Sequence, residues 1–191
     1  MALVNYQKHE IIYKVVYYGT GLGGKTTNLR YLHANLDKSV RGELVTVATE
    51  TERTLFFDFM PLDLGEVGGF KTRFALYTVP GQTEYGESRR MILKGADGII
   101  FVADSSAVRR RANIEALAGM MDNLKEHKLS LAHVPWVLQY NKRDLTDALS
   151  VETLEKDLNE TGVPSFEAIA TEGKAVFATL KSLSHLVVQR Q

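Results

Sequence analysis

The chain alternates short, almost continuous apolar runs with longer stretches whose apolar residues recur at helical spacing. Ile11–Tyr18, Gly98–Asp104 and Trp136–Asn141 are apolar along nearly their whole length, as is typical of strands that are buried on both faces of a parallel sheet. Three stripes of apolar residues every three or four positions lie between or after these runs and predict helices. The stripes are Leu29, Leu32 and Leu36, then Ile114, Leu117, Met121 and Leu124, and finally Val176, Phe177, Leu180, Leu183 and Val187.

One region departs from this alternation. Thr54–Met60 and Phe70–Val79 are two strand-like stretches joined by the glycine-containing segment "LDLGEVGG", a pattern that predicts an antiparallel hairpin. Strand alternation puts Phe57 and Phe59 on one face of the hairpin and Asp58 on the other. We therefore expect an α/β fold, a mostly parallel sheet with one antiparallel edge and helices on both faces, in a single domain spanning residues 1–191. In such sheets ligands bind at the carboxyl ends of the strands.

Composition narrows the class of protein. The chain has 191 residues, of which 45% are hydrophobic and 24% charged, and these values are ordinary for a globular domain. The 23 Lys and Arg residues balance the 23 Asp and Glu residues, so no net field favours nucleic acid or an anionic membrane. The chain has no cysteine, which excludes disulfides, thiolate catalysis and prenylation. We expect a cytoplasmic protein with no direct membrane anchor and no nucleic-acid partner.

The segment "GTGLGGKT", residues 19–26, matches the pattern G-x-x-x-x-G-K-[ST] between a predicted strand and a predicted helix. Glycines let successive backbone N–H groups point at a phosphate, and the helix N-terminus adds partial positive charge. The alternative is a chance glycine-rich turn, which the placement between strand and helix disfavours. Lys25 is expected to reach the β- and γ-phosphates and the Thr26 hydroxyl to bind Mg²⁺. The predicted phosphate-binding residues are Gly19, Gly21, Leu22, Gly23, Gly24, Lys25, Thr26 and Thr27.

A second motif, "NKRD", follows the apolar strand that ends at Asn141. Guanine presents two adjacent donors, N1–H and the N2 amine, and the carboxylate of Asp144 can accept a hydrogen bond from both. Adenine has a bare acceptor at N1 and would face the carboxylate unfavourably. The alternatives are a polar turn that ends a strand and an ATP-binding P-loop protein, and Asp144 discriminates against the latter. The two motifs in this order therefore favour guanine, with Asn141, Lys142 and Asp144 at the base.

Over nearly its whole length the sequence resembles the Ras-like small GTPases and, within them, the bacterial MglA group, which governs cell polarity and gliding motility. The segments that carry the resemblance are "YYGTGLGGKTTNL", "TERTLFFDF", "GFKTRF", "LYTVPGQ", "GIIFVADS" and "QYNKRDL". The resemblance implies a P-loop NTPase fold, Mg²⁺ as the cofactor, and GTP and GDP as substrate and product of a molecular switch. It also implies that Ala170 and Thr171, in "AIATEG", form the backbone contact to the guanine O6 atom.

The same resemblance assigns the residues of hydrolysis. "TVPGQ" aligns with the D-x-x-G-Q element of Ras-like proteins, so Gly81 is implied to contact the γ-phosphate and Gln82 to orient the attacking water. Thr54 is implied as a second magnesium ligand beside Thr26, and Arg53 as an arginine finger supplied in cis. A low intrinsic rate is expected, because loop movement must bring Arg53 and Gln82 onto the phosphate.

Each of these assignments has a simpler alternative. Arg53 can be a solvated loop charge, and Gln82 can cap the helix that follows it. Thr54 competes with Thr49 and Thr51 for the metal. The five histidines show no metal-ligand spacing, so no transition-metal site is expected.

The chain departs from the broader superfamily at one position. The aspartate of D-x-x-G is replaced by Thr78, although the MglA group shares this replacement. Either the organisation of magnesium is weakened, or another carboxylate such as Asp58 takes over the role. The alternative function is accordingly a GTP-binding scaffold with negligible hydrolysis.

The remaining features concern partners. In the MglA group, the surface beside the hairpin aromatics contacts MglB, a Roadblock-fold GTPase-activating protein, and polarity or motility effectors are implied as further partners. The alternative for these aromatic rings is core packing. The basic run Arg109–Arg111 reads as a solvated helix face, with anion or partner binding as its alternative, and Arg89 and Arg90 are candidates for a partner-facing surface.

Overall fold

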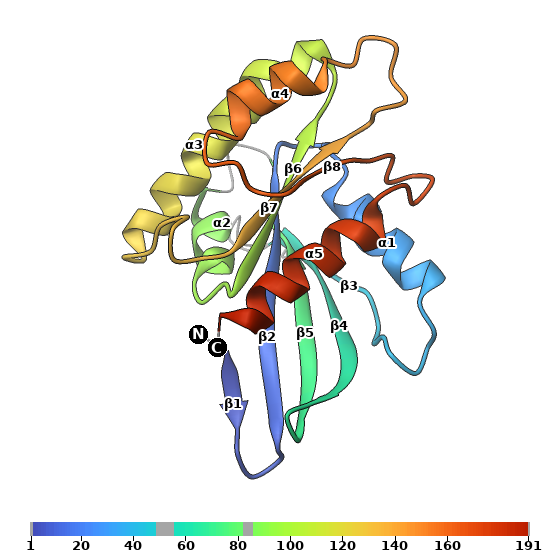
Figure 1. Cartoon of the computed structure of the whole chain (residues 1–191), viewed down its shortest axis with the longest axis vertical. Coiled ribbons are helices and arrows are strands. Elements are labelled where there is room, and N and C mark those ends of the chain that lie inside the picture. The colour runs from blue at the N-terminus through green and yellow to red at the C-terminus, as the bar shows by residue number, and fades with distance from the viewer. Residues whose placement is uncertain (1, 49–55, 82–85, 191) are drawn as a thin grey trace.

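The computed structural model describes residues 2–48, 56–81 and 86–190, and within them one mixed sheet lies between two layers of helices (Figure 1). In chain order, the described elements are β1 (Leu3–Asn5), β2 (Glu10–Gly19), α1 (Lys25–Asn35), β3 (Val45–Ala48), β4 (Phe56–Val67), β5 (Phe70–Thr78), α2 (Gly86–Leu93), β6 (Gly98–Asp104), a 3-10 helix (Ala107–Arg109), α3 (Arg110–Glu126), β7 (Trp136–Asn141), α4 (Val151–Leu158), β8 (Ser165–Glu167) and α5 (Val176–Gln189).

The strands follow the order β3-β4-β5-β2-β6-β7-β8, and β1 pairs with the beginning of β2. Strands β5, β2, β6, β7 and β8 are mutually parallel, whereas β4 is antiparallel to both β3 and β5. The predicted fold class, a mostly parallel sheet with an antiparallel edge, is confirmed. The carboxyl ends of β2, β6 and β7 therefore meet at one edge of the sheet, where such folds bind ligands.

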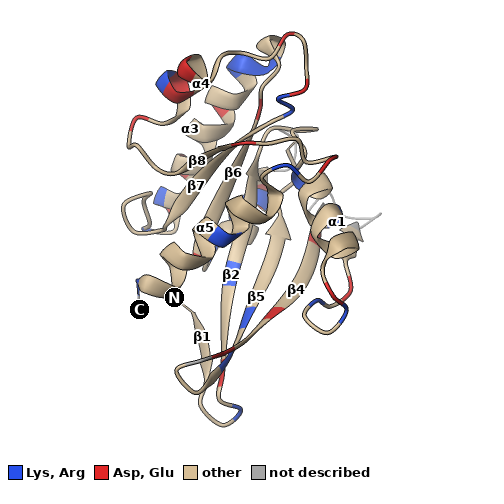
Figure 2. Ribbon diagram, turned by 45° about the vertical axis from the view of Figure 1, so that its right-hand side comes forward, with Lys and Arg blue, Asp and Glu red and all other residues tan. Residues whose placement is uncertain are grey.

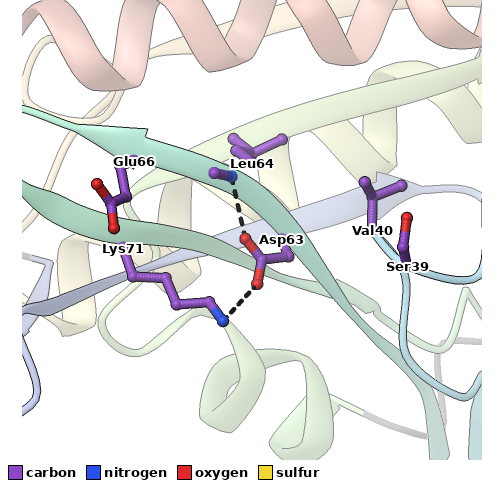
Figure 3. A pocket seen from close by; sticks show the side chains of 7 residues that line it. Ser39, Val40, Asp63, Leu64, Glu66 and Lys71 are labelled. Atoms are coloured by element: carbon purple, nitrogen blue, oxygen red, sulfur yellow. Dashed lines mark hydrogen bonds and ion pairs between the residues drawn. The ribbon is translucent and has the colours of Figure 1, made fainter.

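The hairpin is longer than the sequence predicts. Strand β4 continues past Met60 to Val67, and the turn is confined to Gly68 and Gly69, both at positive φ. The prediction failed because "LDLGE" contains a bulge and not a turn: the register with β5 shifts between Asp63 and Glu66. The side chain of Asp63 stabilises the bulge, since its carboxylate accepts from the Gly65 N–H at 3.0 Å and pairs with Lys71 at 3.1 Å (Figure 3).

Two hydrophobic cores lie on opposite faces of the sheet. One packs α1 and α5 against the sheet, with α5 crossing the strands in Figure 1, and the other packs α2, α3 and α4. Strand alternation divides β2 between them: Val15 and Tyr17 enter the first core, whereas Val16 and Tyr18 enter the second. The runs predicted as strands buried on both faces are therefore confirmed.

The predicted apolar stripes agree with the observed burial in α1 and α5 better than in α3. Leu29 and Leu32 of α1 are buried as expected, and so are four of the five stripe residues of α5, whose Phe177 is 40% exposed. For α3 the stripe is half wrong. Leu124 is buried as expected and Leu117 is half-buried, but Ile114 and Met121 are 43% and 38% exposed, and the residues before them, Asn113 and Met120, are buried instead. Two hydrogen bonds place the side chain of Asn113 on the buried face of α3. Its side chain donates to the Asp104 carbonyl and accepts from the Asp104 N–H, so the buried face is rotated by about one residue.

The surface shows no face of a single charge in the view of Figure 2, where Lys and Arg are interspersed with Asp and Glu.

Strand β1 was not predicted, because three residues with two exposed side chains, Leu3 and Val4, carry too little periodicity. Among the described residues, no helix is long and apolar enough to cross a membrane.

Candidate nucleotide-binding site

The phosphate loop lies where the carboxyl end of β2 meets the N-terminus of α1. Gly24 precedes the first residue of α1 with a left-handed backbone (φ 104°), and a Cβ at this position would collide with the side-chain amide of Asn141. Glycine is therefore required at position 24 both for the backbone conformation and for the close approach of the base loop (the "NKRD" segment, residues 141–144). The first turn of α1 has no acidic residue, so the partial positive charge of the helix N-terminus stays available to an anion.

Lys25 is folded over this loop. Its ammonium group is buried and donates to the carbonyl of Gly19 at 3.0 Å and to that of Thr20 at 2.6 Å. Burial, assisted by the positive charges of Arg89 and Arg109 and opposed by Asp58, lowers the pKa of Lys25 to about 8. The site is therefore short of negative charge, and a bound phosphate would supply it.

The carboxylate of Asp58, on β4, collects three hydroxyl groups. Thr26 donates to Oδ2 at 2.5 Å, Thr78 donates to the same oxygen at 2.9 Å, and Thr46 donates to Oδ1 at 2.8 Å. The backbone N–H of Asp58 in turn donates to the Thr78 hydroxyl at 2.9 Å. Asp58 is only 4% exposed, so a buried carboxylate lies directly beside the hydroxyl that the P-loop motif assigns to magnesium.

These residues fit a magnesium ion bound with a nucleotide. Mg²⁺ in nucleotide sites is held by one or two protein oxygens, by phosphate oxygens and by several waters. Thr26 supplies a hydroxyl at the phosphate loop, and Asp58 supplies a buried negative charge within hydrogen-bond reach of that hydroxyl. Among the described residues, no three His, Cys, Asp or Glu side chains form a metal cluster of their own, so the fit depends on the phosphates.

Gly81 touches the phosphate loop directly. Its carbonyl accepts from the Gly21 N–H at 3.1 Å, and a Cβ at Gly81 would collide with the backbone of Gly21 and Thr20. The close approach requires glycine here. The segment after β5 is thereby joined to the outer side of the phosphate loop.

The base loop is tied to the phosphate loop through Asn141. Its amide donates to the Gly23 carbonyl at 2.9 Å and its oxygen accepts from the Ala170 N–H at 2.9 Å. The Asn141 side chain therefore holds the "NKRD" loop against two other segments, the phosphate loop and the "AIATEG" loop.

The other two residues of the motif lie beside it. Lys142 has a left-handed backbone (φ 64°) and its ammonium pairs with Asp104 at 2.6 Å. Asp144 is exposed, as is Thr171. An exposed carboxylate at the carboxyl end of β7 is open to a base.

A cavity of about 1000 Å³ adjoins the phosphate loop and extends toward α3. Residues 19–22 and 24–27 line it, together with Asp58, Thr78 and Gly81. Its far wall is formed by α3, from Ala112 to Gly119, and by the side chains of Arg89 and Arg109. The smaller hollow of Figure 3, about 520 Å³, surrounds the β4 bulge at the other end of the hairpin, and the contacts of Asp63 there are structural.

The structure brings together the P-loop residues, Gly81, the "NKRD" residues and Ala170. Arg53, Thr54 and Gln82 lie outside the described residues, as do Thr49 and Thr51. Sequence reasoning missed Thr46 and Asp104, which contact Asp58 and Lys142. Asp104 had a signal, because it is the polar residue that ends the apolar run Gly98–Asp104.

Comparison with known proteins decides the family. Residues 2–185 match the ADP-ribosylation factor family. The chain belongs to the ADP-ribosylation factor family of small GTPases. It is also 52% identical over 188 residues to the mutual gliding-motility protein MglA of Myxococcus xanthus (strain DK1622), and the match covers 98% of this chain and 96% of that relative. The predicted MglA-like small GTPase is thereby confirmed, and the family accounts for the P-loop, the mixed sheet and GTP hydrolase activity together.

Proposed function

We propose that this chain is a molecular switch that binds GTP, hydrolyses it to GDP with Mg²⁺, and acts in the control of bacterial cell polarity or gliding motility. The hydrogen bond between Thr26 and Asp58 carries the proposal, because a buried carboxylate beside the hydroxyl that the P-loop motif assigns to magnesium supports metal-dependent hydrolysis. The likeness to a gliding-motility protein supports the cellular role.

The phosphates of the nucleotide bind at the N-terminus of α1. Backbone N–H groups of the phosphate loop other than those of Gly21 and Gly23, which donate to Gly81 and Thr20, would hold the β-phosphate. The ammonium of Lys25, now shared between two carbonyls, would turn to the β- and γ-phosphates. At the base, Asp144 accepts from guanine N1–H and N2, while the backbone at Ala170 and Thr171 faces O6. Asn141 holds these two loops against the phosphate loop.

Thr26 and Thr54 are the proposed protein ligands of magnesium, and Asp58 holds the charge beside them. When bound, the ion neutralises charge on the β- and γ-phosphates. Asp58 and Thr78 fix the Thr26 hydroxyl in place. This arrangement supports the second of the two alternatives for Thr78, in which a neighbouring strand supplies the carboxylate that position 78 lacks.

Hydrolysis is proposed to depend on Arg53 and Gln82. Arg53 provides positive charge to the transferred phosphoryl group, and Gln82 orients the attacking water. Both assignments come from the resemblance to the MglA group. Gln82 directly follows Gly81, whose backbone is bonded to the phosphate loop, and Arg53 precedes β4, which carries Asp58. The intrinsic rate is proposed to be low, because the resemblance implies that both side chains must first be brought onto the phosphate.

The proposed activating partner is an MglB-like protein with a Roadblock domain. The half-buried rings of Phe57 and Phe59 lie against Tyr77, with centroids 5.8 and 4.9 Å away, so core packing accounts for much of this cluster and its outer side is what a partner could contact. The protein is proposed to act in the cytoplasm and to be recruited to cell poles and to motility effectors through partners.

The second candidate is a GTP-binding scaffold with negligible hydrolysis, which the missing D-x-x-G aspartate at position 78 suggests and which the contact of Thr78 with Asp58 argues against. Single-turnover GTP hydrolysis, alone and with a purified Roadblock-domain protein, separates the two. A slow rate that rises on adding the partner supports the switch. A rate at the level of buffer with and without the partner supports the scaffold. Identification of the nucleotide released on denaturation checks the base, and ADP there would contradict both candidates.

A further inference from the structure

The basic run at residues 109–111 does not form one solvated face. Arg110 pairs with Asp157 of α4 through two hydrogen bonds of 2.7 and 2.9 Å, and Arg111 pairs with Glu115 one helical turn along at 2.7 Å. Arg109 points elsewhere: its Nη2 donates to the carbonyl of Gly21, in the phosphate loop, at 2.9 Å. Of three consecutive arginines, one therefore belongs to the nucleotide site.

The position of Arg109 relates it to the terminal phosphate. Gly21, which accepts the bond from Arg109, donates its own N–H to Gly81 at 3.1 Å. Gly81 is the residue proposed to contact the γ-phosphate. Gly21 therefore links Arg109 to Gly81 through two successive hydrogen bonds. Arg109 also lines the cavity that contains Lys25 and Asp58, and its charge is among the causes that lower the pKa of Lys25.

The backbone that carries Arg109 is held by the base loop and by Asp147 just after it. The Ser106 hydroxyl donates to the Asp147 carboxylate at 2.6 Å, and the Ala107 N–H donates to the Asp147 carbonyl at 3.0 Å. Asp104, at the start of the same segment, accepts from Ser106 N–H and pairs with Lys142. The guanidinium is therefore presented from a segment fixed at several points, which lowers the entropy cost of keeping it at the phosphate loop.

We propose that Arg109 determines nucleotide preference in the site: its guanidinium, held at the Gly21 carbonyl, favours GTP over GDP by its positive charge. The inference rests on the proposed function of the site. GTP carries more negative charge than GDP, and the additional phosphate lies on the Gly81 side of the loop. A fixed cation beside Gly21 therefore stabilises the triphosphate more than the diphosphate.

The test compares equilibrium affinities for GDP and for a non-hydrolysable GTP analogue, each with a fluorescent label and excess Mg²⁺. The variants are Arg109→Ala, Arg109→Lys and Arg109→Gln, and the matched controls are Arg110→Ala and Arg111→Ala. Arg109→Ala is expected to lower the preference for the GTP analogue roughly 10-fold, because affinity for the triphosphate falls more than affinity for GDP, and circular dichroism checks that the variant is folded. Arg109→Lys restores part of the preference, and the controls leave it unchanged.

Arg109→Gln separates charge from hydrogen bonding, since its amide can still donate to Gly21 but carries no charge. We expect it to behave like Arg109→Ala. A wild-type preference in Arg109→Gln, or an equal loss of GDP and GTP-analogue affinity in Arg109→Ala, would overturn the inference. If wild-type protein binds neither guanine nucleotide, the proposed function fails, and this result is distinct from a lost preference.

Discussion

The hydroxyl of Thr26 lies 2.5 Å from Oδ2 of Asp58, although the two residues come from α1 and from the antiparallel strand β4. The hydroxyl of Thr78 contacts the same carboxylate oxygen at 2.9 Å. Thr78 stands where the resemblance to Ras-like proteins expects the aspartate of D-x-x-G, and here the neighbouring strand β4 supplies a carboxylate beside the hydroxyl proposed to bind magnesium. A threonine at position 78 therefore serves to hold Asp58.

The buried ammonium of Lys25 makes nucleotide binding dependent on pH. Its pKa is lowered from 10.5 to about 8 in the folded protein, so between these values the unfolded state binds more protons, and stability of the nucleotide-free protein rises with pH in that window. Phosphates restore the charge. GDP binding is therefore expected to take up a proton, and to weaken, as the pH rises through about 8.

Calorimetry of GDP binding in two buffers of different protonation enthalpy measures this uptake. The exposed Lys181 on α5 offers a matched control, and Lys181→Ala should leave the uptake unchanged. Lys25→Ala should abolish tight binding. Retention of wild-type GDP affinity by Lys25→Ala would contradict the phosphate assignment.

The base assignment depends on Asp144. Asp144→Asn is expected to weaken guanine nucleotides strongly and to favour xanthine nucleotides, because an amide donor can pair with the O2 atom of xanthine. Competition binding with GDP and XDP measures the exchange of preference. Asp122→Asn, which changes an exposed carboxylate on α3 that pairs with Lys125, is the control. Unchanged GDP affinity in Asp144→Asn would mean that another residue reads the base.

Substitution of Arg53 or Gln82 is expected to change the rate of GTP hydrolysis without changing nucleotide binding. Arg53→Ala and Gln82→Ala are each expected to slow single-turnover GTP hydrolysis roughly 100-fold or more, while nucleotide affinity stays nearly intact, because the two side chains act on transition-state charge and on water. Arg30→Ala, on the exposed side of α1, serves as the control. A wild-type rate in Arg53→Ala would mean that this arginine is a solvated loop charge.

A buried amide pair links three elements beneath the phosphate loop. Asn28 of α1 and Gln139 of β7 exchange two hydrogen bonds, at 2.8 and 3.0 Å, and Gln139 also donates to Thr179 of α5. All three side chains are fully buried. Gln139→Leu leaves the buried Oδ1 of Asn28 without its donor, while Nδ2 still donates to the Gly24 carbonyl, and is expected to cost about 2–3 kcal/mol of unfolding free energy.

Urea denaturation at fixed pH measures that cost. Gln189→Leu, at an exposed position of α5, makes the same substitution without a buried partner and should leave the free energy of unfolding within about 0.5 kcal/mol of wild type. Equal effects of the two substitutions would show that the amide pair does not stabilise the fold.

Continuous apolar runs could be predicted accurately from the sequence, whereas features set by individual hydrogen bonds could not. The strands Gly98–Asp104 and Trp136–Asn141 were predicted to the residue, because burial on both faces makes most of their positions apolar. Half of the α3 stripe, Ile114 and Met121, was predicted one residue out, since Asn113 is buried by hydrogen bonds that a hydrophobic stripe does not contain. The bulge after Met60 was missed because Asp63 and Gly65 are also typical turn residues.

The same pattern holds in the site. The P-loop and "NKRD" residues are contiguous motifs, so their types and spacing could be interpreted directly. Asp58 could be named only as one possibility for replacing the missing aspartate, because its contact with Thr26 depends on how β4 pairs across the sheet. Arg109 could not be distinguished from Arg110 and Arg111, whose partners come from other elements.

The central claim, that Asp58 organises magnesium beside Thr26, is tested most directly by the Mg²⁺ dependence of GDP release. Asp58→Asn keeps the size of the side chain and removes its charge, and Thr46→Val, which deletes one hydroxyl donor to Asp58, is the control. We expect the Mg²⁺ concentration that half-maximally slows release to rise roughly 10- to 100-fold in Asp58→Asn and to stay near wild type in Thr46→Val. The same half-maximal concentration in wild type and Asp58→Asn would contradict the claim.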